Sequence, residues 1–327
     1  MKTWQHWTSR LLLALALPGL AAAAAAAPEG LSQRTMTIVV PYPPGATTDL
    51  TARLVAEKLQ NRFGQPVIVE NRPGASGNIG ADYVARSAPD GHTLLMATDA
   101  THAGNYHLFK NPPLHPLRDA TPITLAARNV IVLVARADLP ANDIPGLVEY
   151  AKRNPGKLSF GSSGIGSPHH LSGELFNQIA GTDLLHVPYK GGAAAVTDLL
   201  GGNVALVFSS VAESLPYIQE GRLKVLGVTQ AGRYPNLPDV PAIGEALPGF
   251  DVSSWLAFFG PAGIPDEVVA KLNQAIVDAL RSPDVASRLD SVGLLVEAGS
   301  AEDLATQQRT AFDLRGKLVK AIGLTPE

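Results

Sequence analysis

The sequence predicts an α/β protein made of two lobes. Its 327 residues, 46% of them hydrophobic and 17% charged, are enough for two globular domains. Apolar strand-like segments alternate with amphipathic helix-like segments, which is typical of parallel sheets covered by helices. The alternation occurs twice, over residues 37–123 and 130–250. In both halves, loops rich in glycine and hydroxyl residues join strands to helices, and such loops predict a cleft that closes on a small molecule.

Residues 1–27 have the pattern of a cleaved secretory signal peptide. Lys2 and Arg10 precede an apolar stretch at 11–20, and the alanines at 21–27 offer small-residue cleavage sites. The apolar stretch is shorter than the ~20 residues that a membrane-spanning helix needs. We therefore expect an exported protein that works in a bacterial periplasm.

The composition excludes several classes of function. The chain contains no cysteine, which rules out disulfides, thiol catalysis and cysteine-bound metals. The net charge is -3, and no basic stripe is present that would neutralise a phosphate backbone, so we expect no nucleic-acid partner. A small anionic ligand remains compatible, because helix N-termini supply positive potential without formal charge.

The first loop (residues 41–49) joins a predicted strand at 37–40 to a predicted helix at 50–63. The first N–H groups of a helix lack partners within the helix, so such a loop is a natural place to bind a carboxylate or phosphate. Gly45 allows close approach to the backbone, Thr47 or Thr48 is expected to cap the helix, and Gly64 to end it. Taken alone, an ordinary strand-to-helix connection explains the loop equally well.

The rest of the first half continues the alternation. Strands are predicted at 67–70 and 92–97, with a glycine-rich turn at 71–78 and a helix at 79–87 between them. Residues 98–102 follow a strand end directly, where open α/β sheets bind ligands.

The second half contains two further loops of the same design. The second loop (residues 161–170) leads from a strand at 158–160 into a helix, with Ser167 as the N-cap, Pro168 at the first helical position and Gly181 as the stop. The third loop (residues 188–193) follows a strand at 184–187. The remaining elements expected here are strands at 130–135, 204–208 and 224–228 and a helix at 145–153.

The C-terminal region is expected to return to the first lobe. It holds a predicted strand at 256–259, a helix at 265–281 and a final helix starting near Ser300, with Asp303 placed for a capping box. These helices have no parallel sheet of their own nearby, so they are expected to cover the first lobe. The final helix is also a candidate to bridge the two lobes.

Motifs in fixed order along nearly the whole mature chain carry a family resemblance. They are Val40 to Gly45 with Asp49, Gly64 to Val67, Pro73 to Gly80, Ala88 to Gly91, Gly164 to Leu171, His186 to Gly191, Pro238 to Pro241 and Pro261 to Gly263. With these motifs the chain resembles the extracytoplasmic solute receptors of tripartite tricarboxylate transporters, the Bug family.

The resemblance implies a type II periplasmic-binding-protein fold of two doubly wound lobes with a hinged cleft. Lobe 1 would comprise 28–125 and 252–327, and lobe 2 would comprise 126–251. A small mono-, di- or tricarboxylate would be held by backbone N–H groups, hydroxyls and bridging waters, and handed to integral-membrane permease subunits. The receptor would be a monomer without metal, cofactor or catalytic residues.

The expected ligand-binding residues come from the three loops, the strand end at Thr98 and the end of the strand at 204–208. They are Tyr42, Pro44, Gly45, Ala46, Asp49, Thr98, Thr101, Ser162, Ser163, Gly164, Gly166, Ser167, His170, Tyr189, Lys190, Gly191, Gly192, Ala193 and Ser209. Two of them depart from the family pattern, which usually has a glycine pair at Gly45-Ala46 and often an acidic residue at Ser209. Because an acid there would pair with a ligand ammonium, Ser209 favours a plain mono- or dicarboxylate over an amino acid.

Several of these residues also have structural interpretations. Asp49 is placed to cap a helix, a lone histidine such as His170 is usually structural, and most lysines, Lys190 included, are solvated. Tyr42 and Tyr189 are expected to form cleft walls.

Two other functions are alternatives to a transport receptor. A periplasmic hydrolase is disfavoured because the chain has no Gly-x-Ser-x-Gly elbow, no His-Glu-x-x-His pair and no phosphate loop. A role as the ligand-dependent partner of a two-component sensor kinase stays an alternative, since it would need the same cleft.

Overall fold

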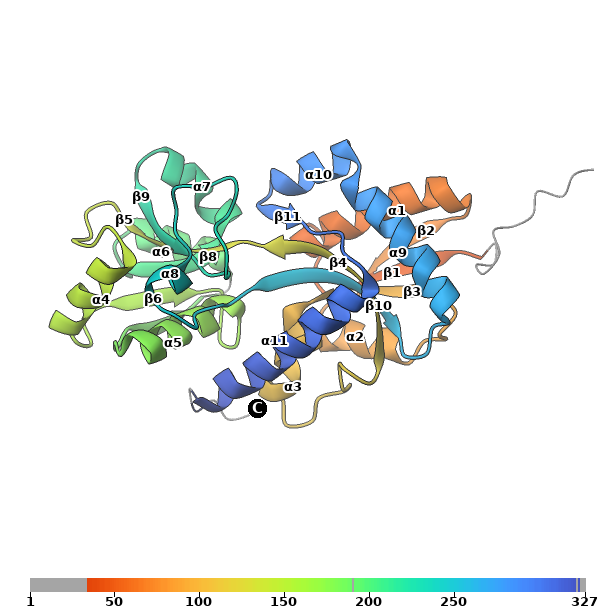
Figure 1. The fold of residues 1–327 in the computed structure, drawn as a ribbon, viewed down its shortest axis with the longest axis horizontal. Helices are drawn as coiled ribbons and strands as arrows, with labels where there is room; N and C mark the ends of the chain where they lie inside the picture. The colour runs from red at the N-terminus through yellow and green to blue at the C-terminus, as the bar shows by residue number, and fades with distance from the viewer. Residues whose placement is uncertain (1–33, 190, 322, 324–327) are drawn as a thin grey trace, which may run out of the picture.

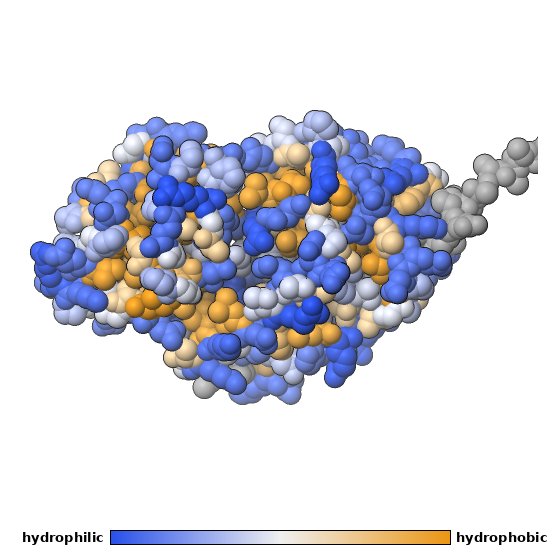
Figure 2. Space-filling view, in the orientation of Figure 1, coloured by the Kyte–Doolittle hydropathy of each residue, from blue (hydrophilic) through white to orange (hydrophobic). Residues whose placement is uncertain are grey.

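The computed structural model describes residues 34–189, 191–321 and 323. The predicted signal peptide and Lys190 lie outside the described residues. Two lobes lie side by side, each with its own sheet covered by helices (Figure 1). On the face seen in Figure 2, hydrophilic residues predominate on both lobes, with smaller hydrophobic patches between them.

Lobe 1 contains a mixed six-stranded sheet in the order β11-β4-β10-β3-β1-β2. Its strands are β1 (Met36–Val40), β2 (Val67–Asn71), β3 (Thr93–Thr98), β4 (Ala120–Asn129), β10 (Ser254–Pro261) and β11 (Leu294–Val296). β1 is parallel to β2 and β3, as predicted, whereas β10 runs antiparallel to both β3 and β4. The predicted parallel pairing thus covers β1, β2 and β3, whereas β10 is antiparallel because it returns from lobe 2 and enters the sheet from the opposite end.

Helices cover both faces of this sheet. They are η1 (Ala75–Gly77), α1 (Thr47–Phe63), α2 (Asn78–Ala85), η2 (Ala100–Gly104), α3 (Asn105–Leu108), α9 (Asp266–Arg281), α10 (Pro283–Asp290) and α11 (Ala301–Ala321). α1, α9 and α10 bury Val55, Leu272 and Leu289 in one core cluster. On the other face, α2 and α11 bury Val84 and Leu304 beside Trp255. The C-terminal helices α9, α10 and α11 thus pack on the same sheet as α1 and α2.

Lobe 2 contains a five-stranded sheet in the order β7-β6-β8-β5-β9. The strands are β5 (Ile131–Arg136), β6 (Ser159–Ser162), β7 (Leu185–Pro188), β8 (Leu206–Ser210) and β9 (Leu223–Val228). The helices are α4 (Ile144–Arg153), α5 (Pro168–Ala180), α6 (Gly192–Leu200), α7 (Val211–Gln219) and α8 (Ile243–Ala246). β6 is parallel to β7 and β8, so the loops that follow these strands emerge at one edge of the sheet.

The chain passes between the sheets twice. It leaves lobe 1 where β4 is followed by β5, and it returns in the segment before Ser254, the first residue of β10. α11 connects the lobes a third time, because Leu304 lies in a lobe 1 core and Leu318 lies in the core that α4 and α5 share. The bridging role considered for the final helix is thus confirmed.

The helix caps follow the local sequence signals with one exception. Ser167 caps α5, and Gly64 and Gly181 end their helices in the left-handed conformation, as predicted. The prediction for α1 was wrong: its N-cap is Ala46, and neither Thr47 nor Thr48 supplies the cap. Residues 98–102, expected as a loop, lead into the helical turns of η2 and α3. No helix among the described residues is long and apolar enough to span a membrane.

Candidate functional site

A cavity of about 440 Å³ lies between the two lobes. Its walls are formed by Tyr42, Ser76, Ala100, Asn105, Leu108 and Phe109 from lobe 1 and by Ser163, Ile165, Gly166, Ser167 and Pro168 from lobe 2. None of these residues carries a formal charge. The site therefore offers hydroxyls, an amide and backbone N–H groups as its polar contacts.

The lobe 2 wall is the second loop and the N-terminus of α5. Ser167 caps the helix by accepting a hydrogen bond from the backbone N–H of His170 at 3.2 Å. Ser163 Oγ lies 2.7 Å from Nδ1 of the buried His169, which fixes the position of the hydroxyl. Among the described residues, no hydrogen bond uses the backbone N–H of Ser163 or Ile165. These groups and the positive end of α5 make this wall suited to an anion.

Two histidines support the second loop from behind. Nδ1 of His170 accepts a hydrogen bond from the backbone N–H of Gly166 at 3.0 Å. Nε2 of His186 lies 2.7 Å from Ser162 Oγ, which in turn accepts from the backbone N–H of Gly164 at 3.1 Å. The two imidazoles stack with 3.9 Å between their centroids. His170 and Ser162 thus shape the wall without lining the cavity.

The same histidines belong to a group with possible metal-ligand spacing. One ligand atom each from His170, Glu174 and His186 lies within 4.8 Å of the others. However, Nδ1 of His170 accepts the Gly166 N–H, so a neutral ring carries its proton on Nε2, the atom 3.5 Å from Glu174 Oε1. A metal-binding histidine needs the opposite arrangement, with the lone pair toward the metal and the other nitrogen donating. The geometry therefore favours hydrogen-bonded support over a metal site.

The lobe 1 wall combines a fixed phenol with a strained turn. The hydroxyl of Tyr42 lies 2.8 Å from Thr98 Oγ1, and burial raises the pKa of Tyr42 to about 12, so it stays a neutral donor. Asn105 Nδ2 donates to the backbone carbonyl of Ser76 at 2.9 Å and to Asn78 Oδ1 at 2.8 Å. Ser76 has a φ of 55°, a left-handed conformation that is strained for a residue other than glycine.

Polar groups of the first loop already have hydrogen-bond partners within the protein. The buried carboxylate of Asp49 accepts the backbone N–H of Gly45 at 3.0 Å and pairs with Arg53 through Nη2 at 2.9 Å. The hydrogen bond from Arg53 is the main reason why the pKa of Asp49 falls to about 2. Asp49 thus holds the loop that carries Tyr42.

Polar groups of the third loop also have partners within the protein. The hydroxyl of Tyr189 donates to Asp198 Oδ2 at 2.8 Å, and the ring does not line the cavity. At the N-terminus of α6, a Cβ on Gly192 would lie only 2.0 Å from Glu213 Oε2. The Glu213 carboxylate accepts the backbone N–H of Ser210 at 3.0 Å.

The structure brings part of the predicted set together. Residues of that set that line the cavity are Tyr42, Ser163, Gly166 and Ser167. The other described members do not line it: Pro44, Gly45, Ala46, Asp49, Thr98, Thr101, Ser162, Gly164, His170, Tyr189, Gly191, Gly192, Ala193 and Ser209. Ser209 is fully buried and hydrogen-bonded to Ser214. Ligand contact by any of these residues stays a prediction.

Sequence reasoning missed most of the lobe 1 wall. Ser76, Ala100, Asn105, Leu108 and Phe109 line the cavity, as do Ile165 and Pro168 of lobe 2. The available signal was the strand end at Thr98, since the seven positions after residue 102 contain three of the missed residues, Asn105, Leu108 and Phe109. Ile165 is 66% exposed and, with Leu108 and Phe109, gives the cavity an apolar part.

Comparisons with known proteins identify the family. The model of the tripartite tricarboxylate transporter family receptor matches residues 51–324. Protein BugT of Bordetella pertussis is 34% identical over 315 residues, which cover 96% of this chain and 94% of BugT. A solved Rhodopseudomonas palustris protein, MatC with bound malate, has 35% identity and a TM-score of 0.72, covering 88% of this chain and 99% of MatC. An R. palustris protein with adipate has 36% identity and a TM-score of 0.77, covering 90% and 99%. The chain therefore belongs to the Bug-type receptor family of the tripartite tricarboxylate transporters, as its motifs predicted.

Proposed function

We propose that the protein is a periplasmic solute-binding receptor that captures a small carboxylate with an apolar body and delivers it to a membrane permease. The observation that carries the proposal is the uncharged cavity between the lobes, with the N-terminus of α5 on one wall and apolar side chains beside it. The malate and adipate bound by two relatives agree with a carboxylate ligand. Periplasmic location rests on the signal-like N-terminus and on the family.

The carboxylate is placed at the second loop. There the N–H groups of Ser163 and Ile165 make no hydrogen bond among the described residues, and the Ser163 hydroxyl lines a cavity whose lining residues carry no charge. Leu108, Phe109 and Ile165 would contact the rest of the molecule. Such a division between a few polar groups and an apolar wall is typical of ligand pockets.

Binding would stabilise the closed form, because the ligand touches both lobes. A ligand shifts a conformational equilibrium only by its differential affinity for the two forms, and the cavity walls come from separate sheets. We assign the hinge to the two crossings, near Val130 and near Val252. Ser163 Oγ lies 2.7 Å from Nδ1 of His169, but burial lowers the pKa of this histidine to about 4, which makes it a weak base, so no chemistry on the ligand is proposed.

The test is a thermal-shift screen of the mature protein against mono-, di- and tricarboxylates, aromatic acids and amino acids, followed by calorimetry. A ligand at 100 times its dissociation constant adds roughly 2.7 kcal/mol to the free energy of unfolding. Ser163→Trp should fill the cavity and abolish binding, whereas Ser291→Trp, at an exposed position of lobe 1, should bind normally. The proposal would be contradicted if no compound in the panel stabilised the protein, even after unfolding and refolding had removed any co-purified ligand. Full ligand affinity in Ser163→Trp would also contradict it.

A further inference from the structure

The side chain of Asn105 presents an unused hydrogen-bond acceptor at the wall of the cavity. Its Nδ2 donates to the backbone carbonyl of Ser76 at 2.9 Å and to Asn78 Oδ1 at 2.8 Å. Because a backbone carbonyl only accepts, the amide nitrogen must be the atom that faces Ser76, which fixes the orientation of the amide. Asn105 Oδ1 therefore points away from Ser76, and no hydrogen bond among the described residues uses it.

This oxygen is reached from the cavity and is not enclosed in protein. The described side-chain atoms that are both enclosed and without a partner belong to six other residues, and Asn105 Oδ1 is not one of them. Asn105 is only 4% exposed and lines the cavity, so the cavity is the space into which its oxygen opens. An acceptor in such a confined place is unfavourable without a donor, and it therefore favours a ligand group that donates.

Asn105 lies within reach of a ligand held at the second loop. Leu108, one turn after Asn105 in α3, lines the same cavity. A Cβ on Gly166 of the second loop would lie 2.8 Å from Cδ1 of Leu108, so the two lobes meet at this point. Asn105 and Ser163 both bound this one cavity of about 440 Å³. A single small molecule can therefore contact both walls.

The two walls have opposite hydrogen-bonding character. Lobe 2 offers the unused backbone N–H groups of Ser163 and Ile165, whereas Asn105 Oδ1 on lobe 1 can only accept. A ligand hydroxyl can donate to this oxygen, but a second ligand carboxylate has no proton to donate. A ligand ammonium could donate too, but none of the residues that line the cavity carries a charge to pair with it.

We propose that Asn105 is a specificity-determining residue that selects a hydroxylated monocarboxylate. The inference rests on the proposed function and narrows its substrate class. The ligand carboxylate binds at the second loop, its hydroxyl donates to Asn105 Oδ1, and Leu108 and Phe109 contact the carbon skeleton between them. An acid without the hydroxyl leaves the acceptor unpaired, so it should bind more weakly than the hydroxy acid.

Calorimetry with matched acids tests this. The pairs are ω-hydroxyhexanoate against hexanoate, and meta- and para-hydroxybenzoate against benzoate, while ω-aminohexanoate and adipate test an ammonium and a second carboxylate. Each acid is titrated into the wild-type protein, Asn105→Ala and Asn78→Ala. Asn105→Ala removes the acceptor. Asn78→Ala removes one partner of Asn105 Nδ2 but leaves Oδ1 in place, so it is the control for a merely structural effect on the wall.

We expect the wild type to bind at least one hydroxy acid about tenfold or more tightly than its parent acid. Asn105→Ala should bring that ratio close to one. Asn78→Ala should weaken both acids of the pair to the same extent and preserve the ratio. The comparison of acids in the wild type needs no variant, so it tests the inference even if Asn105→Ala fails to fold.

Three outcomes overturn the inference. One is a wild type that shows no preference for a hydroxy acid in any pair, or that binds ω-aminohexanoate or adipate more tightly than every hydroxy acid. Another is an unchanged ratio in Asn105→Ala, and the third is an equal loss of the ratio in Asn78→Ala, which would assign the preference to the shape of the wall. Carboxylate binding elsewhere in the thermal-shift panel would then show that the proposed function stands and only this inference fails.

Discussion

Asp49 shows how one residue converts a possible ligand position into a structural support. Its two oxygens accept the backbone N–H of Gly45, two nitrogens of Arg53 and the amide of Asn71, with distances of 2.9–3.0 Å. Because the carboxylate is buried and fully hydrogen-bonded, the first loop does not need an external anion. The loop instead positions Tyr42 at the cavity.

The low pKa of Asp49 predicts a pH dependence of stability. The folded pKa of about 2 lies below the usual 3.8, so the stabilisation is complete above pH 4 and is lost as the pH falls toward 2. A shift of this size corresponds to about 2 kcal/mol. Urea unfolding between pH 7 and pH 2 should show Asp49→Asn less stable than the wild type at pH 7, with the difference shrinking by about that amount toward pH 2. The exposed control Asp183→Asn should follow the wild type, and a gap that stays constant with pH would refute this role.

At the scale of elements, the position of α5 depends on a glycine that faces the sheet. A Cβ on Gly173 would lie 2.1 Å from Cε2 of Phe160, a fully buried residue of β6. The helix therefore packs more closely on the sheet than any other residue would allow. This close packing fixes where the N-terminus of α5 meets the cavity.

Gly173→Ala should destabilise the protein although alanine is the better helix former. The helix-propensity gain of about 1 kcal/mol is outweighed by overpacking of about 2–3 kcal/mol, leaving a net loss of about 1–2 kcal/mol in the free energy of unfolding. Ligand affinity should fall as well, because α5 must shift. Gly201→Ala, after the end of α6 with its nearest atom at 3.5 Å, should change the free energy of unfolding by less than about 0.5 kcal/mol. Equal stabilities of the two variants in urea unfolding would contradict the packing argument.

Most elements were predictable because their signals are local. The cap at Ser167, the stops at Gly64 and Gly181 and the hydrophobic period of α1 are all written within a few neighbouring residues. β4 was missed, and β10 was expected without its antiparallel pairing, because strand partners are set by contacts far along the chain. The same limit applies to the site.

Sequence reasoning found helix N-termini that would have free N–H groups. It did not show that the Asp49 carboxylate already fills the first of them, or that Asn105 bonds the turn at Ser76 beside the cavity. Glu213 caps its own helix, α7, and its carboxylate also lies against Gly192, so no spacing within the third loop reveals it. What remained correct is the second loop, whose cap and cavity-lining residues lie together in the sequence.

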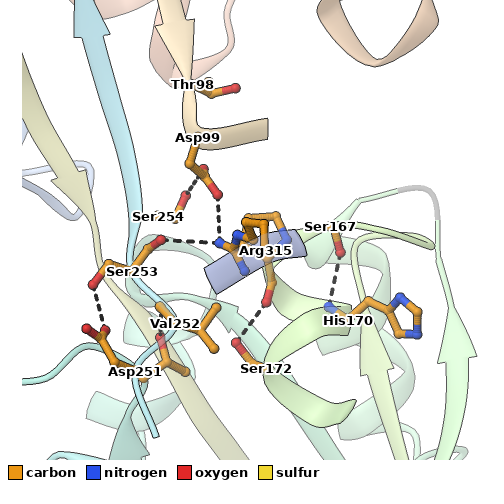
Figure 3. A network of polar contacts seen from close by, with 12 residues as sticks. Thr98, Asp99, Ser167, His170, Ser172, Asp251, Val252, Ser253, Ser254 and Arg315 are labelled. Carbon is orange, nitrogen blue, oxygen red and sulfur yellow. Dashed lines mark hydrogen bonds and ion pairs between the residues drawn. The ribbon is translucent and has the colours of Figure 1, made fainter. Parts of the chain in front are cut away.

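At the scale of the whole molecule, a buried ion pair holds α11 against the returning hinge segment. Nη2 of Arg315 lies 2.7 Å from Asp99 Oδ2 and donates to the carbonyl of Ser253, in the returning hinge segment, at 3.3 Å (Figure 3). Ser254 Oγ donates to the other oxygen of Asp99 at 3.0 Å. Both charged side chains are only 3% exposed, and Leu318 of the same helix lies in the lobe 2 core.

Because this pair is buried, removing one partner should cost far more than removing both. Arg315→Ala leaves Asp99 without a counter-charge and should lower the free energy of unfolding by about 3–5 kcal/mol. The double variant Asp99→Ala, Arg315→Ala should be more stable than the sum of the single losses, with a coupling of at least about 1 kcal/mol. Arg288→Ala, at an exposed position of α10, is the control and should change the free energy of unfolding little.

Since the pair adjoins the hinge segment, closure of the lobes on a ligand should also be altered in the double variant, which small-angle scattering with and without ligand would detect. Additive losses in urea unfolding would mean that Asp99 and Arg315 stabilise the protein independently and that α11 is held to the hinge by apolar packing alone.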